Sequence, residues 1–247
     1  MAFDVLLESV NVLSVLATAA LVILTAKACR ASGVPYLLAI PAGFGLMTIA
    51  FAVQSIMPVL VQGLPALAAP LEAVGLLIQT YGVLFIAFAY ARRTRVRILG
   101  ESTTIDLLVA GLVTLVFLAG VFLAAFYGMM GEAMIGGAAI LRGTIVVASI
   151  YLMYETFRNW QLSQKASQGI VTIGFVFFVI EQIGFILAMS NLGSVAVFLA
   201  YEGRVMGLFV LNAILIVHIT KGDPIIAMRR LGLVAPVHAR MPNMRQS

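Results

Sequence analysis

Seven long apolar stretches follow one another along the chain, separated by short polar connections. Each is close to the roughly 20 residues that an α-helix needs to cross a bilayer. No stretch alternates as a strand does, and a backbone in lipid must satisfy its hydrogen bonds internally, so helices are the expected element. The predicted spans are residues 4–26, 36–58, 69–91, 105–127, 135–157, 168–190 and 194–220.

This pattern predicts an all-α fold, an integral membrane bundle of seven transmembrane helices. Residues 1–222 are expected to form that single domain. Residues 223–247 are expected to form a short cytoplasmic amphipathic segment, starting at an Asp-Pro pair, and then a disordered tail. The first stretch is not a cleavable signal peptide, because Asp4 stands where such peptides carry basic residues.

The composition agrees with a lipid environment. Hydrophobic residues make up 62% of the chain and charged residues only 10%, whereas soluble domains have about 25% charged residues. Such a chain does not cover a water-facing surface, so its main partner is the lipid bilayer. We therefore expect a multi-pass protein of the cell membrane.

The basic residues set the expected orientation. Thirteen of the fifteen lysines and arginines lie in connections on one side of the predicted bundle or in the tail. By the positive-inside rule, the N-terminus is outside and the C-terminus inside. This asymmetry accounts for the net charge of +5 without nucleic acid. The thirteen residues are Lys27, Arg30, Arg92, Arg93, Arg95, Arg97, Arg158, Lys165, Lys221, Arg229, Arg230, Arg240 and Arg245.

The two other arginines, Arg142 and Arg204, lie within predicted spans and share a depth with several acids. Counted from the nearest inner basic residue, these charges are 16 to 20 residues away. At about 1.5 Å per residue, they fall in one slab near the outer side. The predicted polar layer, either a ligand site or a set of structural ion pairs, consists of Glu8, Asn11, Glu72, Gln79, Arg142, Glu181, Gln182, Glu202 and Arg204.

Polar stripes predict which helix faces turn inward, since charged and amide groups avoid lipid. One stripe contains Glu8, Asn11, Ser14 and Thr18; a second contains Glu72, Gly75, Gln79 and Gly82; a third contains Arg142, Ser149 and Thr156.

Arg204 is the charged residue whose expected partner the sequence limits most closely. It lies two residues from Glu202, so the two side chains point to different faces and do not pair well. We expect it to point into the bundle and to be held by Glu72 or Glu181. Gly203 and Gly207 form a GxxxG pair around it, which allows a close helix contact.

The inner face carries a second cluster of charge, which either binds anionic lipid or docks a cytoplasmic partner. The candidate residues are Arg92, Arg93, Arg95, Arg97, Arg229 and Arg230.

Seven helices with an outer N-terminus resemble the topology of rhodopsins and G-protein-coupled receptors. A retinal Schiff base, however, requires a lysine in the middle of the last helix. The lysines of this chain are all near the inner boundary, at Lys27, Lys165 and Lys221. Retinal is therefore not expected.

The residues that the sequence contains also argue against an enzyme. His218 is the one histidine within a span, and it is at a different depth from the acids, so a zinc site or a serine–histidine pair is not expected. Cys29 is the single cysteine, which excludes multi-cysteine metal sites. No phosphate-binding glycine motif is present. We expect no enzyme activity, metal or cofactor.

Three function classes remain. The first is a receptor-like or sensor-like protein with an outer polar site and a basic inner face for a signalling partner. The second is an accessory subunit of a larger membrane complex. A small-solute or ion transporter ranks third, because transport predicts polar residues through the full depth and inverted repeats.

Overall fold

The computed structural model describes residues 2–32, 34–63, 68–99, 115, 133–164, 166–189 and 193–220. Within these ranges the chain is helical and contains no strand, which confirms the all-α expectation. The elements are α1 (Ala2–Ser32), the 3₁₀ turn η1 (Pro35–Leu38), α2 (Ala39–Gly63), α3 (Ala68–Leu99), α5 (Ala133–Ser163), α6 (Ala166–Met189) and α7 (Gly193–Thr220).

Six of these helices are long and apolar enough to cross a membrane. The spans that meet this condition are Glu8–Arg30, Tyr36–Leu60, Leu71–Arg92, Ala138–Leu162, Gln168–Met189 and Val195–Val217. The chain is therefore built as a multi-pass membrane protein. The span expected at 105–127 lies outside the described residues except for Leu115, and the segment 223–247 lies wholly outside them.

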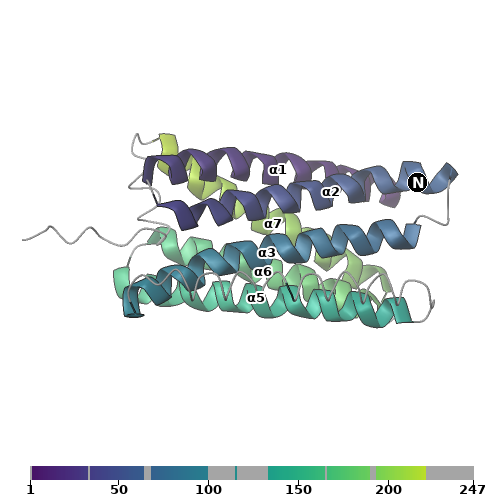
Figure 1. Ribbon diagram of the computed structural model, residues 1–247. Helices are drawn as coiled ribbons and strands as arrows, with labels where there is room; N and C mark the ends of the chain where they lie inside the picture. The colour runs from purple at the N-terminus through teal and green to yellow at the C-terminus, as the bar shows by residue number, and fades with distance from the viewer. Residues whose placement is uncertain are drawn as a thin grey trace, which may run out of the picture.

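The six described helices form a closed ring. Each packs against its neighbours in chain order, α3 packs against α5, and α1 packs against α7 to complete the circle. In Figure 1 the long axes run roughly side by side. Side chains from distant parts of the sequence can therefore meet inside the ring at one level.

Large apolar side chains cover the outside of the ring. Leu16, Val147 and Phe209 are each more than 60% exposed. In water such exposure is unfavourable, whereas against lipid tails it carries no penalty. The outward distribution of apolar groups agrees with a bundle surrounded by bilayer.

The predicted polar stripes lie largely on buried faces. Asn11, Ser14 and Thr18 are buried on α1, and Ser149 and Thr156 are buried on α5. The hydroxyl groups of Ser14, Thr18 and Thr156 donate to backbone carbonyls of the preceding turn, as Thr18 Oγ1 does to the Ser14 carbonyl at 2.7 Å. Such bonds satisfy hydroxyls where water is absent.

Glycine brings two helix pairs unusually close. A Cβ at Gly43 would lie 2.5 Å from the Gly82 carbonyl oxygen, and one at Gly82 would lie 2.7 Å from the Gly43 carbonyl oxygen. This reciprocal contact packs α2 against α3. Gly203 and Gly207 do the same for α7, because both face the backbone or side chains of α6.

Candidate functional site

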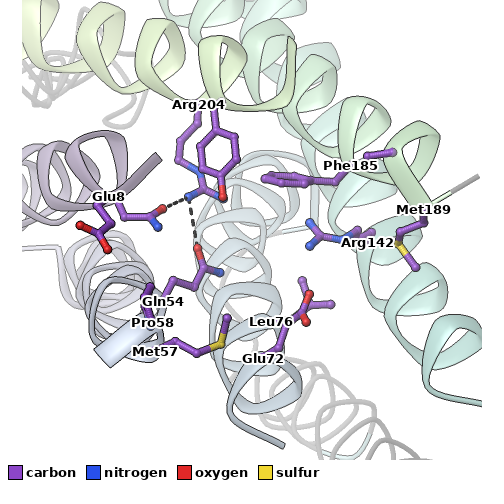
Figure 2. Close-up of a pocket in the computed structure, with 13 residues that line it drawn as sticks. Glu8, Gln54, Met57, Pro58, Glu72, Leu76, Arg142, Phe185, Met189 and Arg204 are labelled. Atoms are coloured by element: carbon purple, nitrogen blue, oxygen red, sulfur yellow. Dashed lines mark hydrogen bonds between the residues drawn. The ribbon is translucent and has the colours of Figure 1, made fainter. Parts of the chain in front are cut away.

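A cavity of about 470 Å³ lies near one end of the ring, and every described membrane-crossing helix contributes to its wall (Figure 2). This end is formed by the start of α1, α3, α5 and α7 and by the end of α2 and α6. The lining residues are Glu8, Asn11, Gln54, Met57, Pro58, Glu72, Leu76, Arg142, Phe185, Ala188, Met189, Tyr201 and Arg204.

Arg204 is the most connected side chain of the site, and only 1% of it is exposed. Its Nε donates to Glu181 Oε1 at 2.7 Å. Its Nη1 donates to Asn11 Oδ1 at 3.0 Å and to Gln54 Oε1 at 3.1 Å, as the dashed lines in Figure 2 mark. The guanidinium carbon also lies 4.5 Å from the centre of the Phe51 ring. One arginine of α7 therefore ties α6, α1 and α2 together.

The local sequence makes the bond between Arg204 and Glu181 possible. Gly203 precedes the arginine and faces α6, where a Cβ would lie 2.9 Å from both the Glu181 amide nitrogen and the Phe177 carbonyl oxygen. Only a residue without a side chain permits this approach of the two backbones. Of the two carboxylates expected to hold Arg204, Glu181 is the one in contact.

A layer of buried amides surrounds the ion pair. Gln79 is fully buried, and its Nε2 lies 3.4 Å from Glu181 Oε1. Glu181 and Gln182 are also fully buried. Within the described part of the chain, the second Glu181 oxygen, Oε2, has no hydrogen-bond partner. These three side chains do not line the cavity themselves but contact its two arginines or each other.

Arg142 lies in the wall of the cavity on α5 and is 8% exposed. Its guanidinium carbon lies 4.2 Å from the centre of the Phe185 ring, a cation–π contact. Its Nη1 lies 3.4 Å from Gln182 Oε1. Figure 2 shows the guanidinium reaching toward the open space between the helices. The same Phe185 ring is 5.4 Å from Arg204, so one aromatic side chain connects the two arginines.

The acidic residues of the predicted polar layer differ in whether they line the cavity. Glu8 and Glu72 have exposed side chains and line the cavity. Glu202 is also exposed, but it does not line the cavity, so it is not part of the buried layer. Two residues along a helix correspond to a rotation of about 200°, which turns Glu202 away when Arg204 faces inward.

The opposite end of the ring carries the basic residues. The Arg92 side chain is partly buried, and its guanidinium carbon lies 5.2 Å from the centre of the Tyr36 ring. Arg93, Arg95 and Arg97 follow in the last turns of α3. Arg229 and Arg230 lie outside the described residues.

Sequence reasoning missed several side chains of the site. Gln54 accepts a hydrogen bond from Arg204, and the only signal for it was one amide in the apolar span 36–58. Phe51, Phe185 and Tyr201 contact the arginines through their rings. An aromatic residue in an apolar helix has no pattern that separates a cation–π partner from an ordinary core residue.

Among the described residues, no three histidine, cysteine, aspartate or glutamate side chains are grouped to hold a metal ion. Comparison with known protein families, curated proteins and solved structures finds no match for this chain. The cavity and its charges are therefore the basis for any statement about function.

Proposed function

We propose that this chain is a non-enzymatic, receptor-like or sensor-like protein of the cell membrane that binds a small polar molecule in the cavity. The observation that carries the proposal is the cavity of about 470 Å³ with lining residues from all six described membrane-crossing helices. Pockets for small molecules have volumes of about 300–1,000 Å³ and combine apolar walls with a few polar groups. A ligand here touches every described span, so its binding biases how the helices pack.

The chemistry of the lining favours binding over catalysis. Within the described part of the chain, no serine, threonine, cysteine, histidine or lysine lines the cavity. The nucleophilic groups that the lining does contain are the Tyr201 hydroxyl and the Glu8 and Glu72 carboxylates, and no histidine or lysine of the described lining stands beside them as a base. The lining instead offers guanidinium, amide and aromatic groups, which recognise a ligand without reacting with it.

We infer seven membrane crossings from the direction of two neighbouring helices. The N-terminal halves of α3 and α5 both reach the cavity, through Glu72 on α3 and Arg142 on α5. Both helices therefore run away from the cavity end, as their colours in Figure 1 also indicate. Residues 100–132 must link the far end of α3 to the near end of α5, which requires an odd number of crossings. The apolar stretch 105–127 has the length for one.

The orientation follows from charge. The positive-inside rule puts the end with Arg30, Arg92 and Arg158 in the cytoplasm and the cavity in the outer half. The cytoplasmic arginines then face anionic lipid or a signalling partner. Binding of a ligand at the outer side changes how the helices pack at the inner side.

Cysteine labelling tests both the number of crossings and the orientation. We expect single cysteines at Ser102 and Glu132, introduced in a Cys29→Ala background, to be labelled from opposite sides of the membrane by an impermeant maleimide. A cysteine at Ser247 is expected to react only after the membrane is opened. Labelling of positions 102 and 132 from the same side would exclude a single crossing between them, and labelling of position 247 in intact cells would reverse the orientation.

A cavity-filling variant tests ligand binding. We expect at least one compound in a panel of amino acids, carboxylic acids, sugars and nucleosides to raise the melting temperature of the purified full-length chain in nanodiscs. At a concentration of 100 times Kd, such a ligand stabilises the bundle by about 2.7 kcal/mol. Ala188→Phe places a ring in the cavity and should abolish the effect.

Leu16→Phe is the matched control, because Leu16 is 63% exposed on the outer face of α1. This variant should keep the response to the ligand. If no compound stabilises the wild-type chain more than Ala188→Phe, the polar layer only packs helices. That result would favour an accessory subunit of a membrane complex over a receptor.

A further inference from the structure

The two arginines of the cavity differ in how their charges are balanced. Arg204 is paired with a carboxylate at 2.7 Å. Arg142 forms no ion pair within 4.0 Å among the described residues, and its Nε has no hydrogen-bond partner. Within the described ranges it makes one hydrogen bond, to Gln182, which is 3.4 Å long. The cavity wall therefore contains a buried cation whose hydrogen-bonding capacity is mostly unused.

A buried guanidinium destabilises the fold unless another group accepts hydrogen bonds from its N–H donors. A buried charge without a partner is one of the largest penalties in a folded protein, and more so in a membrane. The Phe185 ring covers one face of the Arg142 guanidinium and offsets part of the cost. The edge of the guanidinium, which carries the N–H donors, stays available to the cavity. That edge matches the two oxygens of a carboxylate.

The rest of the lining limits the charge and the shape of what binds there. Glu8 and Glu72 at the exposed part of the cavity disfavour an anion with two or more charges. Arg204 is already occupied by three oxygen acceptors, so one guanidinium is available for one anionic group. Apolar side chains, including Leu76, Phe185 and Met189, form other parts of the wall (Figure 2).

We propose that the cavity binds a small monocarboxylate, with its carboxylate on the Arg142 guanidinium and its apolar part against Phe185, Leu76 and Met189. This proposal rests on the proposed function and names the ligand class for the same site. The carboxylate accepts hydrogen bonds from the free N–H groups of Arg142, and the apolar part of the ligand packs against the apolar side chains of the wall.

The first test measures the chain without ligand. Because Arg142 has no carboxylate within 4.0 Å among the described residues, Arg142→Met should leave the melting temperature in nanodiscs unchanged or higher. Arg204→Met should lower it clearly, because Arg204 is paired. A loss for Arg142→Met as large as that for Arg204→Met would overturn the proposal, since Arg142 would then hold the bundle together.

The second test measures binding with three acids, namely benzoate, phenylacetate and hexanoate, each beside its neutral amide. At least one acid should stabilise the wild-type chain while its amide does not. Arg142→Met should weaken that acid about tenfold or more, as expected for loss of a charge-assisted hydrogen bond. Glu72→Gln changes an exposed side chain, so it should fold normally, and it should tighten binding about two- to fivefold by removing a like charge.

The remaining outcomes separate this proposal from the broader one. If neutral or cationic compounds bind, are blocked by Ala188→Phe and ignore Arg142→Met, the receptor proposal stands and the carboxylate assignment fails. Equal shifts of the melting temperature by an acid and its amide would overturn the carboxylate assignment as well. Stabilisation by phosphatidylglycerol nanodiscs that none of the acids competes away would assign the Arg142 site to a lipid phosphate instead.

Discussion

Arg204→Ala is expected to destabilise the bundle by about 3–5 kcal/mol, the usual result of removing one partner of a buried ion pair. The substitution leaves Glu181 as an uncompensated charge in a fully buried position. It also removes the donor to Asn11 and Gln54, so the hydrogen bonds that Arg204 makes to α1 and α2 are lost together. The melting temperature of the purified chain in nanodiscs measures the effect.

Two further variants identify the cause. Arg158→Ala removes an exposed arginine of α5 and should change stability by less than about 1 kcal/mol. Adding Glu181→Gln to Arg204→Ala should recover part of the loss, because the stranded charge disappears while the amide keeps its shape. Equal melting temperatures for Arg204→Ala and Arg158→Ala would contradict a buried pair between Arg204 and Glu181.

Gly203→Ala is expected to destabilise the bundle by about 1–3 kcal/mol, the usual range for overpacking a close contact. The added Cβ would lie 2.9 Å from two backbone atoms of α6, at Glu181 and Phe177, and backbone does not move aside as a flexible side chain does. The helices must separate, which also lengthens the bond between Arg204 and Glu181. This loss is expected although alanine is a better helix former than glycine by about 1 kcal/mol.

Gly45→Ala is the matched control for this prediction. Gly45 lies within α2, and its nearest neighbour would be a Val22 methyl group at 4.0 Å, an ordinary contact. This substitution should be neutral or stabilising in the same melting experiment. If both glycine variants behave alike, the close approach of α6 and α7 does not control the geometry at Arg204.

The sequence by itself determined the class of the protein and the level of the site. Apolar length predicted helices that cross a membrane, and six of the expected spans coincide with helices of that kind. Counting residues from the inner arginines placed Glu8, Glu72, Arg142 and Arg204 at one level, and these four side chains line the same cavity. Depth follows from sequence because each helical residue adds a fixed rise of about 1.5 Å.

Only the tertiary structure decided which of these groups meet. Glu72 and Glu181 were equal candidates for Arg204 by depth, and the close contact of α6 with α7 selects Glu181. The same packing leaves Arg142 with no carboxylate within 4.0 Å in the part of the chain that the structure describes. The physical reason is that rise along one helix sets only a height. The order of helices around the ring and the rotation of each about its axis depend on contacts between segments far apart in the chain.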